Sequence, residues 1–272
     1  MIYFSPAKIN LGLHVLERRE DGFHELRSVM YPTGLCDIIE IHQLNDEKLP
    51  VRLSQSGIHF GSDPERNLCM RAWKLMASER ELPPVAIHLH KQIPVGAGLG
   101  GGSSNASTIL RGLNLLAPIP ASTERLEELA CQLGSDCPFF LQDEPMMMEG
   151  RGELLSPVKV SLKNYFLVLL FPEIHISTAE AYGAVSPSIP DLQLQQMIEL
   201  PVDRWKTRVK NDFETNAFIK HPLLKSLKID LYRAGARYAS MSGSGSSLYG
   251  IFEKLPELAP EIRKYVIWTG PA

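Results

Sequence analysis

The residues with the most specific chemical potential form a glycine-rich loop followed at once by small hydroxylated residues. Residues 94–105 read Pro-Val-Gly-Ala-Gly-Leu-Gly-Gly-Gly-Ser-Ser-Asn. Glycines allow backbone N–H groups to crowd around a guest because no Cβ intervenes. The first turn of a following helix adds unpaired N–H donors and the positive end of its dipole. Together these features predict a phosphate-binding loop, in which Ser103 or Ser104 could donate to a phosphate or approach a Mg²⁺ ion.

Three familiar phosphate-binding motifs do not fit this loop. A Walker A loop needs a lysine after its closing glycine, and Gly102 stands at that position. Residues 96–101 have the spacing of a dinucleotide fingerprint, but no acidic residue ends a strand about 20 residues later. The protein-kinase set fails too, because residues 85–88, Val-Ala-Ile-His, lack its lysine and the chain has no HRD or DFG motif.

The loop lies between two elements with clear periodicity. Residues 85–90 alternate as a half-buried strand, and the apolar residues of 103–116 share one helical stripe. The other expected elements are strands at 2–15 with a break near Gly12, 35–44, 51–53 and 165–171, a strand–loop–strand at 241–252, a turn-rich stretch at 145–160, and helices at 67–79 and from the caps Ser122 or Thr123 to Leu133 with Gly134 at C′. Strands and helices in this mixed order favour α+β layers over a doubly wound sheet.

Composition narrows the class of protein. The 272 residues are 44% hydrophobic and 22% charged, which is typical of a globular chain with one large or two modest domains, and we place the boundary near Leu155. A net charge of −3 provides no general attraction for nucleic acid or an anionic membrane. The N-terminus does not resemble a signal peptide, and the apolar run at 165–171 is too short to span a bilayer. Cys36, Cys69, Cys131 and Cys137 form no CxxC pair, so we expect free thiols in a cytoplasmic protein.

Two further segments complete a pattern with the glycine loop. Residues 6–11 read Pro-Ala-Lys-Ile-Asn-Leu, and residues 243–247 read Gly-Ser-Gly-Ser-Ser. In this order and at this spacing, the three blocks resemble those of the GHMP kinases. The resemblance implies a two-domain α+β fold. Residues 1–155 would form an ATP-binding domain like ribosomal protein S5 domain 2, and residues 156–272 would form an α+β sandwich domain.

Two more blocks narrow the resemblance to one branch of the GHMP kinases. Residues 21–26, Asp-Gly-Phe-His-Glu-Leu, and residues 134–140, Gly-Ser-Asp-Cys-Pro-Phe-Phe, resemble segments of the members that act on a CDP-linked methylerythritol. The implied reaction is the ATP-dependent phosphorylation of the 2-hydroxyl of the erythritol part, a step of the non-mevalonate isoprenoid pathway. ATP would be the co-substrate, with Mg²⁺. The implied partner is a small molecule rather than nucleic acid or membrane, and the implied assembly is a monomer or homodimer.

The same resemblance assigns roles to individual residues. Asp136 matches the family's catalytic base, and Lys8 matches the lysine paired with it, which would keep the carboxylate ionised and stabilise developing charge. Taken alone, Asp136 reads as a turn residue and Lys8 as a strand-edge lysine. Cys137 precedes a proline, so we expect extended backbone there. The implied ATP-binding residues are Pro94, Val95, Gly96, Ala97, Gly98, Leu99, Gly100, Gly101, Gly102, Ser103, Ser104, Asn67 and Lys91. The implied substrate-binding residues are Asn10, Phe23, His24, Thr178, Tyr182, Gly243 and Ser244, with Phe23 and Tyr182 on opposite sides of the cytosine.

Several alternatives stay open. Another GHMP kinase, such as homoserine kinase, would have no use for a nucleobase-reading pair at residues 22–24. A non-catalytic nucleotide sensor would not need both Lys8 and Asp136. RNA binding through the ribosomal-protein-like fold conflicts with the acidic net charge. His88 and His90 share the polar face of a strand, and a solvated face is favoured over a metal pair because no third ligand is evident.

Overall fold

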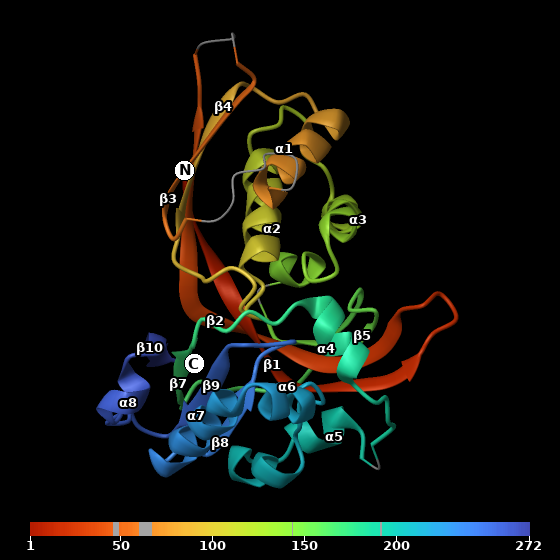
Figure 1. Cartoon of the computed structure of the whole chain (residues 1–272). Coiled ribbons are helices and arrows are strands. Elements are labelled where there is room, and N and C mark those ends of the chain that lie inside the picture. Colours follow the sequence, from red (N-terminus) through yellow and green to blue (C-terminus); the bar gives the residue numbers. More distant parts are fainter. Residues whose placement is uncertain (46–48, 60–66, 143, 191) are drawn as a thin grey trace. The chain divides into compact units, whose positions relative to one another are not determined.

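The computed structural model describes residues 1–45, 49–59, 67–142, 144–190 and 192–272 (Figure 1). Contacts divide the chain into two compact units. Unit 1 comprises residues 1–7, 35–95 and 100–143, and unit 2 comprises residues 8–34, 96–99 and 144–272. Strands β1 (Ile2–Arg18) and β2 (His24–Gln43) pair with each other, and each contributes residues to both units.

Unit 1 packs three helices on one face of its strands (Figure 1). Strand β4 (Val85–Lys91) lies between β3 (Val51–Gly57), to which it is parallel, and β2, to which it is antiparallel. The helices are α1 (Leu68–Glu79), α2 (Gly101–Asn114), α3 (Thr123–Leu133) and the short 3₁₀ helix η1 (Pro138–Leu141). The inward side chains of β2 and β4 meet those of α1, α2 and α3 in one apolar core.

The helix ends of unit 1 follow local capping chemistry. Asn67 caps α1 by accepting a hydrogen bond from the Cys69 N–H at 2.9 Å, and Ser122 caps α3 by accepting one from Arg125 N–H at 3.3 Å. Both starts therefore confirm the sequence prediction. Helix α2 begins at Gly101, two residues earlier than expected, because Gly100 adopts left-handed backbone with φ 69° and turns the loop directly into the helix.

Unit 2 contains a four-stranded antiparallel sheet and several short helices. The sheet order is β10 (Val266–Pro271), β7 (Phe166–Leu170), β9 (Leu248–Phe252) and β8 (Tyr238–Met241), while β5 (Met146–Gly150) joins the first part of β2 to β6 (Leu154–Pro157). The helices are α4 (Thr178–Ala184), α5 (Leu194–Ile198), η2 (Val202–Thr207), α6 (Glu214–Lys220), α7 (Pro222–Arg233) and α8 (Pro260–Arg263). Helix α7 packs on β8 and β9 and buries Leu224, Leu227 and Leu231.

Three strand predictions need correction. Strands β5 and β6 occupy the stretch 145–160, which the sequence indicated as turns, because Met146–Met148 are buried without the alternation that marks a half-exposed strand. The first half of β2 was missed for the same reason, since residues 28–31 are buried on both faces. Strand β1 runs through Gly12 unbroken, and a Cβ there would lie 2.7 Å from Leu194 Cδ1.

The expectation of free thiols is confirmed. All four cysteines are free thiols. His88 and His90 share hydrogen bonds with Ser56, and the described residues hold no cluster of three or more His, Cys, Asp or Glu that could bind a metal ion. Within the described part of the chain, no helix is both long enough and apolar enough to cross a membrane.

Candidate functional site

The first turn of α2 is the predicted phosphate site of unit 1. No side chain caps its N-terminus, so the backbone N–H groups of this turn are the donors that an anion would meet. Ser104 is fully buried, and its hydroxyl shares a 2.7 Å hydrogen bond with that of Ser5. Ser103 is partly exposed and interacts with the Cys137 thiol. Of the two serines, Ser103 is therefore the better placed to reach a ligand.

A buried ion pair supports this turn from behind. Lys91 is paired with Asp37, and both side chains are almost completely buried. Asp37 Oδ1 accepts the backbone N–H of Gln92 at 2.7 Å and of Ile93 at 2.8 Å, and Asp37 Oδ2 accepts the Asn105 side chain at 2.8 Å. Burial lowers the pKa of Lys91, and the Asp37 carboxylate opposes this shift. The pair joins β2 and β4 to the start of α2.

The predicted base Asp136 lies in the turn between α3 and η1, beside the start of α2. Ser107 on α2 donates a 2.7 Å hydrogen bond to the Cys137 carbonyl. Burial, with a smaller contribution from the Asp136 carboxylate, raises the pKa of the Cys137 thiol to about 11. Cys137 is helical, with φ −62° and ψ −43°, so the expected extended pre-proline backbone is wrong. The 3₁₀ turn that starts at Pro138 overrides the preference.

Asn67 also belongs to this part of unit 1. A Cβ on Gly102 would contact Leu68 at 3.4 Å, which places the start of α1 beside the first turn of α2. Unit 1 thus brings Asn67, Ser103 and the Asp136 turn around one helix N-terminus. The side-chain oxygen of Asn67 caps α1. The Asp37 carboxylate, which the sequence analysis did not single out, is paired with Lys91. The available signal for Asp37 was an acidic residue in a mainly apolar stretch of strand that also contains Glu40.

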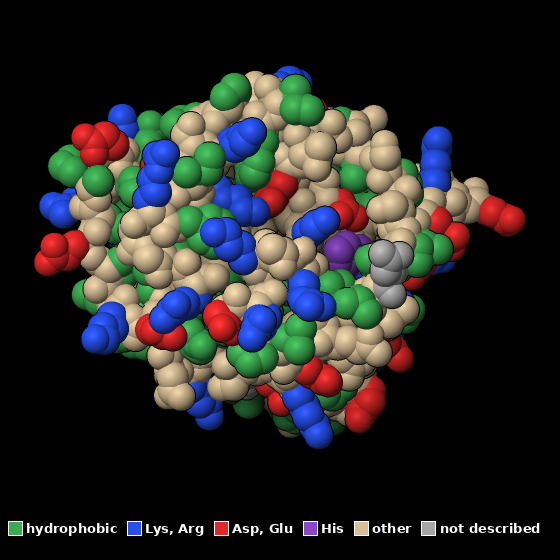
Figure 2. Space-filling model, turned by 90° about the horizontal axis from the view of Figure 1, so that it is seen from below, with side chains coloured by type: hydrophobic (Ala, Val, Ile, Leu, Met, Phe, Trp, Pro, Cys, Tyr) green, Lys and Arg blue, Asp and Glu red, His purple; other side chains and the backbone are tan. Residues whose placement is uncertain are grey.

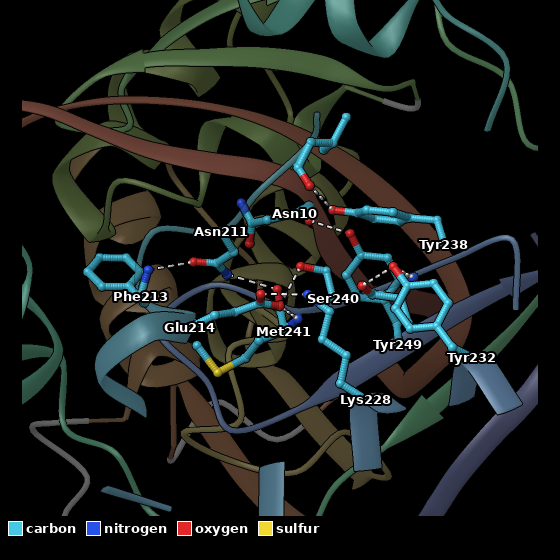
Figure 3. A network of polar contacts seen from close by, with 12 residues as sticks. Asn10, Asn211, Phe213, Glu214, Lys228, Tyr232, Tyr238, Ser240, Met241 and Tyr249 are labelled. Atoms are coloured by element: carbon cyan, nitrogen blue, oxygen red, sulfur yellow. Dashed lines mark hydrogen bonds and ion pairs between the residues drawn. The ribbon is translucent and has the colours of Figure 1, made fainter. Parts of the chain in front are cut away.

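In unit 2, Lys8 and Asn10 form a buried polar row along β1. Lys8 Nζ donates to Asn10 Oδ1 at 2.7 Å, and Asn10 Nδ2 donates to Ser28 Oγ at 2.8 Å. Ser28 in turn donates to the Gly12 carbonyl at 2.6 Å. Tyr249 donates to the Asn10 carbonyl at 2.7 Å (Figure 3). These contacts fix the Lys8 ammonium in one place inside the unit.

Two glycine segments of unit 2 lie directly against each other beside Lys8. Ser242 Oγ donates to the Gly98 carbonyl at 2.9 Å, and Ser247 N–H donates to the Ala97 carbonyl at 3.1 Å. A Cβ on Gly98 would lie 2.1 Å from the Ser242 carbonyl oxygen, and one on Gly243 would lie 3.5 Å from Lys8 Nζ. Residues 96–99 of the predicted ATP loop and Gly243 of the predicted substrate loop are therefore neighbours.

The predicted aromatic residues divide into two groups. His24 stacks on Tyr182 with ring centroids 5.1 Å apart, and Phe213 meets Tyr182 edge-to-face at 4.9 Å. Phe23 is 56% exposed in the turn before β2, where the Arg151 guanidinium lies 5.1 Å from its ring centroid. The described ring contact of Tyr182 is therefore with His24 rather than Phe23. Successive residues at the start of a strand point to opposite faces, which separates the two rings.

The remaining predicted substrate residues also lie in unit 2. Thr178 is exposed in the first turn of α4, which Ser177 caps by accepting the Glu180 N–H at 3.2 Å. Ser244 lines a mainly apolar pocket with residues of α4 and α6. Residues 211–214, Asn-Asp-Phe-Glu, were not singled out from the sequence although they touch several of these groups. Asn211 and Asp212 lie between η2 and α6, and Glu214 begins α6.

Comparison with known proteins identifies the fold and the family. The sequence matches the family models for the GHMP kinases N terminal domain over residues 67–144 and the GHMP kinases C terminal domain over residues 202–266. A 4-diphosphocytidyl-2-C-methyl-D-erythritol kinase of Bacteroides fragilis (strain YCH46) is 47% identical over 252 residues, covering 93% of this chain and 92% of the relative. This chain belongs to the 4-diphosphocytidyl-2-C-methyl-D-erythritol kinase family of GHMP kinases.

Further comparisons agree with membership of this kinase family. A relative of the same name from Azobacteroides pseudotrichonymphae is 48% identical, covering 93% of this chain and 94% of the relative. A crystal structure of 4-(cytidine 5'-diphospho)-2C-methyl-D-erythritol kinase is 33% identical with a TM-score of 0.82, covering 99% of this chain and 98% of that chain. A homoserine kinase structure from Cytophaga hutchinsonii is 15% identical with a TM-score of 0.70, covering 97% of this chain and 87% of that chain, and shares the fold alone. The expected two-domain GHMP kinase fold is thus confirmed.

Proposed function

We propose that this chain transfers the γ-phosphoryl group of ATP to the 2-hydroxyl of 4-diphosphocytidyl-2-C-methyl-D-erythritol. The observation that carries the proposal is its similarity, over nearly the whole chain, to relatives named for this kinase activity. The uncapped start of α2 beside the Asp136 turn supports a phosphoryl-transfer reaction at that position. The reaction would be a step of the non-mevalonate isoprenoid precursor pathway.

The nucleotide phosphates are proposed to bind at the first turn of α2. Its N–H groups are available to an anion, and Gly102 leaves the approach open because, within the described part of the chain, a Cβ there would meet only Leu68 within 4 Å. Mg²⁺ fits this donor set, since it is commonly held by one or two protein oxygens together with substrate phosphates, and Ser103 would supply a hydroxyl oxygen. Bound there, Mg²⁺ would neutralise charge on the phosphates.

Catalytic roles are proposed for Asp136 and Lys8. Asp136 would accept or orient the proton of the attacking hydroxyl, as a positioned carboxylate does in other phosphoryl transfers. Lys8 would stabilise the negative charge that develops during transfer. The hydrogen bond from Lys8 Nζ to Asn10 Oδ1 supports this role because it restrains the ammonium before substrate arrives.

Cytidine recognition is proposed for the aromatic residues of unit 2. The His24–Tyr182 stack presents a flat, restrained surface, and Phe23 is exposed enough to rest on a base. Thr178, Gly243 and Ser244 would contact the rest of the substrate. A small-molecule substrate agrees with the face in Figure 2, where Lys and Arg side chains are interspersed with acidic and hydrophobic ones rather than gathered in a stripe. A cytoplasmic monomer or homodimer, with a domain boundary near residue 155, completes the proposal.

A substrate panel tests the proposed function directly. The purified protein is incubated with ATP and Mg²⁺ and with 4-diphosphocytidyl-2-C-methyl-D-erythritol, homoserine or mevalonate in turn, and ADP release is followed. We expect turnover with the CDP-linked alcohol alone and competition by CMP and CDP, because these carry the cytidine group. Turnover with homoserine, or no competition by cytidine nucleotides at high concentration, would contradict the assignment.

A further inference from the structure

Four consecutive residues, 211–214, each hold a different part of unit 2. Asn211 binds the second glycine loop, Asp212 binds β1, Phe213 contacts Tyr182, and Glu214 binds β8. We propose that Asn211 is a positioning residue that sets the second glycine loop for the reaction, an inference that rests on the proposed function. Figure 3 shows the hydrogen bonds of Asn211 with the Phe213 N–H and the Met241 carbonyl, and that of Glu214 with the Met241 N–H.

The Asn211 amide uses its hydrogen-bonding groups on defined partners. Its Nδ2 donates to the carbonyl oxygens of Met241 and Gly243, both at 2.8 Å, and its Oδ1 accepts the Phe213 N–H at 3.0 Å. The side chain is only 2% exposed. Two carbonyl partners on one side and an N–H on the other define the orientation of the amide. Asn211 therefore clamps the end of β8 and the first glycine of the loop together.

The loop needs such a clamp because its glycines are conformationally soft. Gly243 and Gly245 have φ values of 57° and 97°, in the left-handed region that glycine enters freely and other residues avoid. Gly243 also lies beside the Lys8 ammonium, because a Cβ built on Gly243 would be 3.5 Å from Lys8 Nζ. The hydrogen bond from Asn211 to the Gly243 carbonyl therefore holds the backbone that lies next to the Lys8 ammonium.

The neighbours of Asn211 attach the same segment to the rest of the site. Asp212 Oδ2 accepts the Val15 N–H at 2.9 Å, on the strand that carries Lys8 and Asn10. Glu214 Oε1 accepts the Met241 N–H at 2.8 Å, and Glu214 Oε2 is paired with Lys228 at 2.6 Å.

The Phe213 ring holds Tyr182 against His24. A shift of residues 211–214 would thus disturb the glycine loop and the aromatic stack together.

The substitution Asn211→Asp tests the proposal because it is nearly isosteric. It keeps the acceptor for the Phe213 N–H but replaces the donor facing two carbonyls with an acceptor. The matched control is Asn114→Asp in unit 1, where a buried asparagine likewise accepts one backbone N–H, from Ala121 at 2.7 Å, and donates to a carbonyl at 3.1 Å. We expect Asn211→Asp to lower kcat/KM for the CDP-linked alcohol about 10- to 100-fold, with little change in KM for ATP. Asn114→Asp should leave both parameters near wild type.

Amide hydrogen exchange provides a readout that needs no turnover. Exchange at residues 243–247 should become faster in Asn211→Asp than in Asn114→Asp. If Asn211→Asp does not fold, Asn211→Ser replaces it, because serine can accept the Phe213 N–H in the same turn but reaches the two carbonyls less well. Equal kinetics and equal loop exchange for the variants at 211 and 114 would overturn the proposal. The two proposals can fail separately. If the wild-type protein turns over no CDP-linked alcohol, but residues 243–247 still exchange faster in Asn211→Asp than in Asn114→Asp, the proposed function is overturned and the role of Asn211 in holding the loop is retained.

Discussion

Two buried strand lysines, Lys8 in unit 2 and Lys91 in unit 1, occupy similar positions but have different partners. Both were assigned to the site by resemblance, and their exposed fractions are 4% and 2%. Lys91 is paired with the carboxylate of Asp37, whose oxygens also accept hydrogen bonds from two backbone N–H groups and from the Asn105 side-chain amide. Lys8 donates to the neutral amide oxygen of Asn10 and lies beside a glycine loop.

The two lysines differ in the charge of a partner that each one contacts: Asp37 is a carboxylate, whereas the Asn10 side chain is a neutral amide. A carboxylate at hydrogen-bond distance already neutralises the Lys91 ammonium, so a phosphate would have to compete with Asp37. The Asn10 amide oxygen orients the Lys8 ammonium without cancelling its charge. Proximity to a glycine loop is therefore a weaker criterion for function than the charge of the lysine's partner.

The largest expected effect comes from removing the proposed base. Asp136→Asn keeps the size of the side chain but removes its charge and basicity, so kcat should fall about 10²- to 10⁴-fold with little change in either KM. Combining it with Lys8→Met should cost much less than the product of the two single effects, because residues that act as a unit fail together. Steady-state kinetics of the two single variants and the double variant measure this coupling. Multiplicative effects would show that Lys8 and Asp136 act independently.

The same substitution at both lysines tests the comparison itself. Lys91→Met leaves the Asp37 carboxylate buried without its cation and should lower the free energy of unfolding by about 3–5 kcal/mol. Lys8→Met removes the donor to the neutral amide oxygen of Asn10, and should cost about 1–3 kcal/mol. The loss of turnover should follow the opposite order, with Lys8→Met slower than Lys91→Met, when both variants are assayed at temperatures well below their thermal unfolding midpoints. Urea unfolding provides the free energies, and a larger loss of stability for Lys8→Met would reverse our assignment.

Neighbouring glycines of the first loop provide a smaller, more local test. A Cβ on Gly101 would lie 2.8 Å from both Ile93 Cγ2 and Lys91 Nζ, so Gly101→Val should disturb the supporting ion pair and the fold. Gly102→Val should leave unfolding near wild type, because its Cβ position has space in the protein, but should weaken ATP binding about tenfold or more by filling the approach to the N–H groups. Calorimetric titration with a non-hydrolysable ATP analogue measures the affinity. Normal affinity in a folded Gly102→Val protein would remove this turn from nucleotide binding.

The smallest expected effect concerns alkaline pH. All four cysteines lie in unit 1, and burial raises the pKa of Cys137 to about 11 from a model-compound value of 9.0. The stability that this buried thiol contributes is complete below pH 9.0 and is lost as pH rises towards about 11, because the unfolded chain ionises first. Unfolding free energies of wild type and Cys137→Ala measured from pH 7 to pH 10 should therefore converge as pH rises. A constant difference would show that the thiol titrates normally in the fold.

Local signals predicted much of unit 1. Asn67 and Ser122 cap helices that the sequence located to within a residue, because a capping side chain acts on N–H groups two or three positions away. The glycine loop followed by α2 was visible for the same reason. By contrast, the partner of Lys91 lies 54 residues away in sequence, and no pattern near residue 91 indicates a carboxylate there.

Unit 2 was less predictable because its elements are short and its contacts distant. The sequence predicts that Phe23 and Tyr182 face each other across a cytosine, but it did not predict the ring contacts of Tyr182 with His24 and Phe213. Asn211 was missed entirely, because the two carbonyl groups to which its side chain donates lie 30 and 32 residues later in the chain.

The contact between Gly98 and Ser242 has a consequence for how the protein is made. The two residues are 144 positions apart, and the Ser242 hydroxyl and the Ser247 N–H that hold the first glycine segment belong to a part that the ribosome produces near the end. At about 5–20 residues per second, Gly98 leaves the peptidyl-transferase centre roughly 7–30 s before Ser242 is added. During that interval residues 96–99 of the nascent chain lack the hydrogen bonds that Ser242 and Ser247 later donate to them. Residues 96–99 therefore gain these contacts only when synthesis is almost complete.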